Sequence, residues 1–144
     1  MTAKIIIFDI DNTILTQTNR SPYDWRDLSG DKPIPPMRDL IATLQAAGYY
    51  IVLSTGRPER VRPQTEAWLL ENGICYNKLY LNEVPRGKTV EHKERVLMSI
   101  QEKGYEVAMV FEDDARCAAM YVSHGILTLS PLNYQIHKKE TPTI

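Results

Sequence analysis

The feature that most constrains the fold is an alternation of short apolar runs with segments of helical periodicity. The first run, residues 4–10, is nearly continuous in apolar side chains, which is typical of a strand buried on both faces. Strands that alternate with helices form parallel sheets, because each parallel connection needs a crossover. We therefore predict an α/β fold with a doubly wound, parallel five-stranded sheet. The expected strands are residues 4–10, 50–53, 78–81, 106–111 and 126–129, and the expected helices are 37–47, 65–70, 89–103 and 115–123.

Two segments do not follow either period. Residues 15–36 contain four prolines and several charges, so we predict a long loop or small flap there. Residues 131–144 are polar, and we predict a loosely held tail. The length of 144 residues suits one domain, and we expect residues 1–144 to form a single domain with the flap at 15–36 as an insertion.

Composition excludes several classes of protein. Hydrophobic residues make up 43% and charged residues 24%, which excludes disorder as the overall state. The net charge of −1 excludes the broad basic field of a protein that grips many nucleic-acid phosphates. Cys75 and Cys117 make neither a disulfide framework nor a metal-ligand pair. We therefore expect a reducing compartment, most simply the cytoplasm, and nothing in the sequence indicates a membrane segment.

Polar residues follow three of the predicted strands at their carboxyl ends. Ligands of open α/β sheets bind at this edge, so we expect these groups to converge on one site. The three groups are Asp9-Ile10-Asp11-Asn12-Thr13, Ser54-Thr55-Gly56-Arg57 and Glu112-Asp113-Asp114.

Carboxylates packed this closely repel one another unless a cation lies between them. Mg²⁺ favours one or two carboxylates together with phosphate oxygens, which makes Asp9 and Asp113 the natural pair of ligands. A backbone carbonyl near Asp11 is a further candidate ligand. A carboxylate beside Mg²⁺ and a phosphoryl group can act as a nucleophile, and a second carboxylate two residues later can exchange the proton. The pattern predicts phosphoryl-transfer chemistry.

Two other interpretations are weaker. Residues 86–89, Arg-Gly-Lys-Thr, look like the end of a phosphate-binding P-loop, but Asn82 stands where that loop needs its first glycine. A receiver-type signalling module carries its phosphoacceptor Asp at the end of the third strand, and that end is also Asn82 here. We therefore expect an enzyme.

Together these motifs resemble the haloacid dehalogenase superfamily of phosphotransferases. The segment from Asp9 to Thr13 resembles its first motif, with Asn12 where glycine is usual. Thr55 stands at the hydroxyl of the second motif, Lys88 or Lys93 at the lysine of the third, and Asp113 at the fourth, paired with either Glu112 or Asp114. Further pieces, such as residues 19–24, 54–57 and 92–94, are similar to the 3′-phosphatase domain of bacteriophage polynucleotide kinase–phosphatase. The resemblance spans about residues 3–130.

The resemblance implies a role for each matching residue. Asp9 would be the nucleophile, Asp11 the acid and base, and Thr55 the hydroxyl that holds a phosphoryl oxygen. Lys93 would bridge the phosphate and Asp9. Mg²⁺ would be the cofactor, held by Asp9, Asp113 and the backbone carbonyl of Asp11. The expected substrate-binding residues are Arg20, Thr13, Gly56, Arg57 and Lys88.

We therefore predict a Mg²⁺-dependent phosphomonoesterase that removes a 3′-phosphate from nucleic acid or nucleotide through an aspartyl-phosphate. The alternative is a phosphatase of mononucleotides or another small phosphorylated metabolite. A small flap leaves the site open and favours a polymeric substrate, whereas the net charge of −1 favours the small one. The phosphorylated end is the expected partner, and no pattern in the sequence indicates a membrane or a protein partner.

Overall fold

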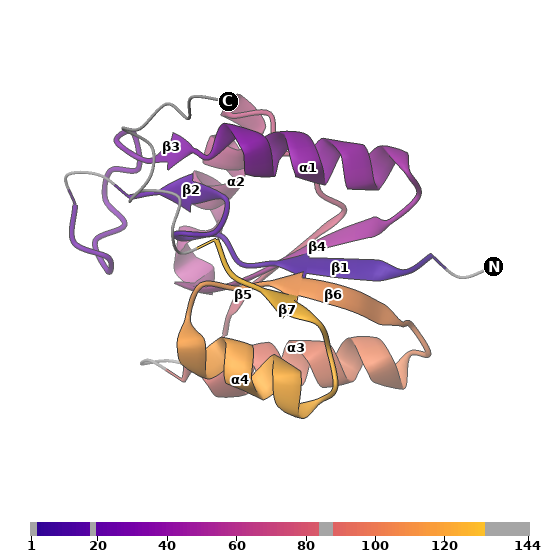
Figure 1. Cartoon of the computed structure of the whole chain (residues 1–144). Coiled ribbons are helices and arrows are strands. Elements are labelled where there is room, and N and C mark those ends of the chain that lie inside the picture. Colours follow the sequence, from indigo (N-terminus) through magenta and orange to yellow (C-terminus); the bar gives the residue numbers. More distant parts are fainter. Residues whose placement is uncertain (1–2, 18–19, 84–87, 132–144) are drawn as a thin grey trace, which may run out of the picture.

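A computed structural model describes residues 3–17, 20–83 and 88–131 of the chain. Its centre is a five-stranded parallel sheet in the order β5-β4-β1-β6-β7, which confirms the predicted α/β fold (Figure 1). The strands are β1 (Ile5–Phe8), β4 (Tyr50–Pro58), β5 (Lys78–Asn82), β6 (Val107–Phe111) and β7 (Thr128–Leu129).

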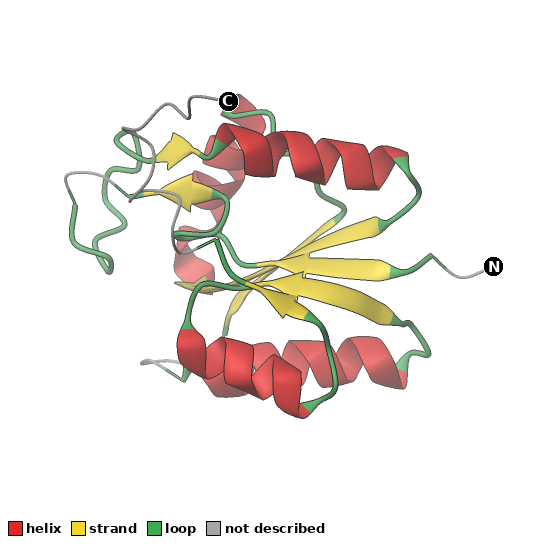
Figure 2. Cartoon of the chain, viewed as in Figure 1, coloured by secondary structure: helices red, strands yellow, loops and turns green. Residues whose placement is uncertain are grey.

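Helices cover both faces of this sheet. Figure 2 shows α1 (Pro35–Ala46) and α2 (Arg62–Glu71) on one face and α3 (Thr89–Glu102) and α4 (Ala115–Ser123) on the other. Alternate side chains of β1 face opposite sides of the sheet. Ile6 and Phe8 belong to one hydrophobic cluster, and Ile5 and Ile7 belong to the other. A central strand that faces two cores needs apolar residues at every position, which explains the continuous apolar run.

Sequence periodicity located the strands better than their ends. β1 ends at Phe8 and not at the predicted residue 10, because the chain of the first motif, from Asp9 on, leaves the strand and turns at Ile10. β4 continues five residues beyond the predicted end at Leu53. Its register against β5 shifts between Ser54 and Pro58, so this polar part of the strand bulges out of the regular ladder. The run of apolar side chains that predicted the strand therefore ends at Leu53, before the strand itself does.

The flap is packed against the domain. Within residues 15–36 the strands β2 (Leu15–Thr16) and β3 (Lys32–Pro33) form an antiparallel pair, and α1 already begins at Pro35. Trp25 and Leu28 are buried and belong to the core cluster under α1 and α2. The expected tail lies, apart from Pro131, outside the described residues. The single-unit organisation stays a prediction.

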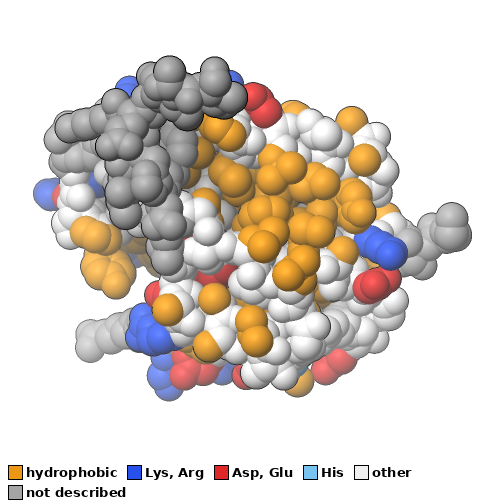
Figure 3. Space-filling view, viewed as in Figure 1, with side chains coloured by type: hydrophobic (Ala, Val, Ile, Leu, Met, Phe, Trp, Pro, Cys, Tyr) orange, Lys and Arg blue, Asp and Glu red, His pale blue; other side chains and the backbone are white. Residues whose placement is uncertain are grey.

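The topology places the carboxyl end of β1 at a crevice. The chain passes from β1 to β4 and β5 on one side and then returns through α3 to β6 on the other side, so the strand order reverses at β1. Such a switch point is where open α/β sheets bind ligands. Hydrophobic side chains gather elsewhere, beside α1 over the β7 edge of the sheet (Figure 3). Among the described residues no helix is long and apolar enough to cross a membrane.

Candidate active site

The turn after β1 presents the first motif. The backbone N–H groups of Thr13 and Ile14 both donate to the carbonyl of Ile10, which closes a tight turn. Asn12 has φ of 60° within it, a conformation that glycine and asparagine adopt at the least cost. This explains how Asn12 replaces the glycine that is usual there. Asp9 and Asp11 are thereby aimed into the crevice from one short segment.

The bulge of β4 presents the second motif beside the first. The Thr55 hydroxyl oxygen accepts a hydrogen bond from the backbone N–H of Arg57 at 3.1 Å, which holds the bulge in shape. A Cβ added to Gly56 would lie 2.8 Å from Cγ2 of Thr89, the first residue of α3. Gly56 therefore lets β4 and the start of α3 meet closely.

Three carboxylates meet at the ends of β1 and β6. Asp9, Glu112 and Asp113 each offer one oxygen, and these oxygens lie within 4.8 Å of one another. The buried ammonium of Lys93 joins two of the three, with Nζ 3.0 Å from Asp9 Oδ1 and 2.8 Å from Glu112 Oε2. The Thr13 hydroxyl lies 3.3 Å from Asp9 Oδ2 and 3.2 Å from Asp113 Oδ1.

The charges of this cluster are not balanced by Lys93 alone. Burial and the neighbouring carboxylates raise the pKa of Asp113 to about 8 and that of Glu112 to about 7. Burial lowers the pKa of Lys93, but Asp9 and Glu112 outweigh it, so the net shift is upward and the ammonium stays charged. Oxygen ligands with surplus negative charge fit a hard divalent cation such as Mg²⁺.

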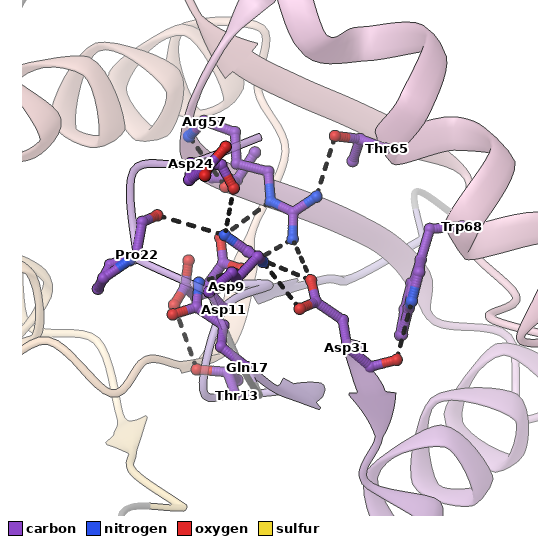
Figure 4. A network of polar contacts seen from close by, with 12 residues as sticks. Asp9, Asp11, Thr13, Gln17, Pro22, Asp24, Asp31, Arg57, Thr65 and Trp68 are labelled. Carbon is purple, nitrogen blue, oxygen red and sulfur yellow. Dashed lines mark hydrogen bonds and ion pairs between the residues drawn. The ribbon is translucent and has the colours of Figure 1, made fainter. Parts of the chain in front are cut away.

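Asp11 belongs to a second polar network on the flap side (Figure 4). The guanidinium of Arg57 donates to both carboxylate oxygens of Asp11, at 2.9 and 2.8 Å, in a bidentate pair. Arg20 makes the same kind of pair with Asp31, at 2.9 and 2.8 Å. Weaker contacts of 3.4 Å link Arg57 to Asp31 and Arg20 to Asp11, so the four charges form one unit.

Aromatic and polar side chains hold this network in place. The ring of Trp25 lies about 5 Å from both guanidinium carbons, 5.1 Å for Arg20 and 5.0 Å for Arg57. Trp68 of α2 donates its indole N–H to the carbonyl of Asp31 at 3.2 Å. Burial raises the pKa of Asp11, but the hydrogen bonds and charge of Arg57 outweigh it, so the net shift is downward. Asp11 is therefore a carboxylate in the free site.

Removing Asp31 is expected to destabilise the fold strongly. Its side chain is fully buried, and Asp31→Ala would leave the guanidinium of Arg20 without its bidentate partner and remove one contact of Arg57. Breaking a buried ion pair from one side costs about 3–5 kcal/mol. Chemical denaturation should show a loss of that size in the free energy of unfolding. The exposed carboxylate of Asp39 provides the matched control, and an equal effect of Asp39→Ala would contradict the assignment.

The structure brings most of the predicted site residues to one hollow of about 190 Å³. Asp9, Asp11, Thr55, Gly56, Arg57, Lys93 and Asp113 all line it. Three others do not line it. Thr13 is buried and contacts Asp9 and Asp113, Arg20 contacts Asp11, and Lys88 is exposed at the start of α3. Their roles in catalysis and in substrate binding remain predictions.

Some residues of the site carry no sequence signal of their own. Asp31 lies in the flap, where no periodicity points inward, and Gln17, which donates to Asp11 at 2.9 Å, lies there too. Glu112, which the sequence left as one of two partners for Asp113, joins the carboxylate cluster. Asp114 instead caps α4 by accepting from the N–H groups of Arg116 and Cys117.

Comparison with known proteins places this site in a family. The family model of the polynucleotide kinase PNKP phosphatase domain matches residues 3–131, which is most of the chain. A search of curated protein sequences found no match.

Solved structures share the fold. A chain of the Pnkp1/Rnl/Hen1 RNA repair complex matches with a TM-score of 0.81 and 22% identity, over 89% of this chain and 42% of that one. A second Pnkp1/Rnl/Hen1 complex matches with a TM-score of 0.79 and 25% identity, over 88% and 45%. This chain therefore spans less than half of those chains. They come from protein complexes, so the expectation that this chain has no protein partner stays untested.

A smaller phosphatase has the same architecture over nearly its whole length. The D,D-heptose 1.7-bisphosphate phosphatase from B. bronchiseptica, solved with magnesium and phosphate, matches with a TM-score of 0.63 and 14% identity, over 96% of this chain and 88% of that chain. The fold, the clustered first and fourth motifs and the near-complete family match lead to one conclusion. The chain belongs to the family of polynucleotide kinase PNKP phosphatase domains, and it is a phosphatase of the haloacid dehalogenase superfamily.

Proposed function

We propose that this phosphatase removes a 3′-phosphate from a nucleic-acid or nucleotide end through an aspartyl-phosphate on Asp9. The contact of 3.0 Å between Asp9 Oδ1 and the buried Lys93 ammonium, in a hollow that Asp11 also lines, is the observation that supports it most. A fixed cation beside a carboxylate draws an anionic phosphoryl group toward that carboxylate. The family match supports the choice of a polynucleotide substrate.

Mg²⁺ is the proposed cofactor, and its proposed ligands are Asp9, Asp113 and the backbone carbonyl of Asp11. The carboxylate cluster of Asp9, Glu112 and Asp113 suits it in charge and in ligand type. When bound, Mg²⁺ would neutralise charge on the phosphoryl oxygens and orient the group. Glu112 remains paired with Lys93 in this proposal and adds negative charge to the site.

The first step breaks the ester bond of the substrate. A carboxylate oxygen of Asp9 forms a bond to phosphorus while the bond from phosphorus to the leaving oxygen breaks. The hydroxyl of Thr55 holds one phosphoryl oxygen and Lys93 holds another. Asp11, a carboxylate in the free site, takes up one proton from solvent as the negative charge of the incoming phosphate raises its proton affinity, and it gives this proton to the leaving oxygen.

The second step releases phosphate, after which Asp11 returns its proton to solvent and the starting state is restored. Asp11, now a carboxylate, takes a proton from water, and the water oxygen forms a bond to phosphorus as the bond to Asp9 breaks. The bidentate pair with Arg57 favours this carboxylate form and fixes its direction. We therefore assign Arg57, and Arg20 behind it, to the positioning of Asp11, beside the substrate contacts that the family resemblance implies.

A phosphatase of mononucleotides or small metabolites is the second candidate. It is favoured by the internal pairing of Arg20 and Arg57 with Asp11 and Asp31, which leaves few free cations for a nucleic-acid backbone. The net charge of −1 also favours a small substrate, because it gives the chain no overall attraction for a nucleic-acid backbone.

A substrate panel separates the two candidates. It compares 3′- and 5′-phosphorylated oligonucleotides, 3′- and 5′-mononucleotides and sugar phosphates, each with Mg²⁺ and with excess chelator. The proposal expects the highest kcat/KM for the 3′-phosphorylated oligonucleotide and loss of turnover in chelator. Efficient hydrolysis of sugar phosphates with no activity on the oligonucleotide would replace the proposal by the second candidate. Full activity in excess chelator would show that the reaction does not need Mg²⁺ and would overturn that part of the proposal.

A further inference from the structure

A second hollow adjoins the catalytic one on the flap side. Its volume is about 440 Å³, which is large enough for a nucleoside. Tyr23 and Trp25 of the flap line both hollows, so the two adjoin at these residues. The opposite wall of the second hollow comes from the segment after β4 and the start of α2, with Arg60 and Gln64.

The two aromatic residues of this wall differ in what they can contact. Trp25 is only 9% exposed, and its ring is already stacked against the guanidinium groups of Arg20 and Arg57. Tyr23 is 85% exposed, and its side chain makes no hydrogen bond or ring contact within the described part of the chain. Exposing a large aromatic ring to water is unfavourable, and a nucleobase is a natural partner for it.

The arginines around the hollow differ in whether a carboxylate already pairs with them. Arg62 is engaged by Glu59 and by Glu66 at 3.1 Å, and Arg26 forms a bidentate pair with Asp24. Arg60 is exposed and forms no ion pair with any described residue. Its guanidinium therefore has both of its donor edges available for a phosphate.

The chemistry of the proposed function gives the direction of the substrate. Asp11 protonates the leaving oxygen, so the nucleoside bonded to that oxygen must extend from the Asp11 side of the catalytic hollow. Asp11 is fixed there by Arg57, whose guanidinium lies over Trp25. Since Trp25 is the wall that the two hollows share, a group attached to the leaving oxygen passes over it into the second hollow.

We propose that the second hollow binds the terminal nucleoside of a 3′-phosphorylated strand, with its base stacked on Tyr23 and its 5′-phosphate paired with Arg60. This inference rests on the proposed 3′-phosphatase function and deepens it. It predicts that recognition is confined to the last nucleotide, because Arg60 is the unpaired cation of this hollow within the described residues.

The test uses substrates that differ by one group. For stacking, kcat/KM is compared between a deoxynucleoside 3′-monophosphate and the abasic deoxyribose 3-phosphate. Tyr23→Ala should lower the ratio of kcat/KM for the nucleotide to kcat/KM for the abasic phosphate by about tenfold. Only the nucleotide has a base that can stack on the tyrosine, so only its kcat/KM should fall. For the phosphate, release of the 3′-phosphate is compared between a nucleoside 3′,5′-bisphosphate and the 3′-monophosphate. Arg60→Gln should lower that ratio by about tenfold.

Matched controls lie far from the hollow. Tyr105→Ala removes a 43% exposed tyrosine at the opposite end of the sheet, and Arg95→Gln removes an exposed arginine on α3. Both should leave the two ratios unchanged. If the wild-type chain releases 3′-phosphates but Tyr23→Ala and Arg60→Gln leave the ratios unchanged, the hollow is not the nucleoside site while the proposed function stands. If the wild-type chain ignores 3′-phosphates altogether, both proposals are overturned.

Discussion

Replacing Asp9 by Asn is expected to abolish turnover with every phosphate ester. The uncharged amide oxygen is too weak a nucleophile to attack phosphorus, so no phosphoenzyme can form. The variant should still fold, because the amide oxygen can accept from Lys93 and because one of the clustered negative charges is removed. Acid-quench trapping of labelled phosphoenzyme gives the measurement, with circular dichroism as the check on folding.

Asp11→Asn is expected to fail differently. With an unactivated ester, loss of the acid and base should lower the rate by about 10²–10⁴-fold. A nitrophenyl ester has a leaving group that needs no proton, so its first step should survive. Since water would lack its base, phosphoenzyme should accumulate and nitrophenolate should appear as a burst. Equal losses in the rate of phosphoenzyme formation with both esters would contradict this division of roles between Asp9 and Asp11.

The substitution at Asp11 has a structural consequence that must be separated from the chemical one. An amide in place of the carboxylate accepts only one of the two hydrogen bonds from Arg57 and no longer balances its charge. The unfolding free energy of Asp11→Asn should therefore fall, though less than that of Asp31→Ala, because Asp11 is partly exposed and Asp31 is not. A stability loss without the burst would leave Asp11 a merely structural role.

Much of the fold follows from local patterns in the sequence. The helix α4 was predicted with its observed bounds, since an acidic cap precedes it and a glycine follows it. The central strand was predicted because residues that face two cores must all be apolar. The strands β2 and β3 were not predicted, because two residues are too few to show any period.

The candidate site was predictable where it depends on strand ends. Asp9, Thr55 and Asp113 come at the carboxyl ends of the predicted central strands, and parallel topology brings such positions together. The pairing of Arg57 was not predictable in the same way. Its position after the predicted strand 50–53 indicated a phosphate contact, but its guanidinium is 1% exposed and is held by two carboxylates. One of these, Asp31, comes from the flap, and only tertiary structure brings it there.

Lys93→Ala is expected to be the second most damaging single change, and Lys88→Ala a mild one. The Lys93 ammonium lies between Asp9 and Glu112, is 2% exposed, and reaches the catalytic hollow from the second turn of α3. Lys93 has two proposed roles. In the free site it balances buried negative charge, and in the reaction it binds an oxygen of the phosphoryl group. Lys88 is exposed and does not line the hollow.

The two roles of Lys93 predict two measurable losses. Removing one preorganised donor costs about 10²–10³-fold in kcat, whereas Lys88→Ala should cost less than about tenfold. Without the ammonium, the pKa of Glu112 should rise further above its present value of about 7, because only the backbone N–H of Asp114 would then oppose burial and Asp9. Lys93→Arg keeps the charge and should recover stability more fully than rate, since a planar guanidinium cannot place its donors where the ammonium stands. If Lys88→Ala proves more harmful than Lys93→Ala, the phosphate is held at the start of α3, and the assignment of Lys93 as its bridge to Asp9 is wrong.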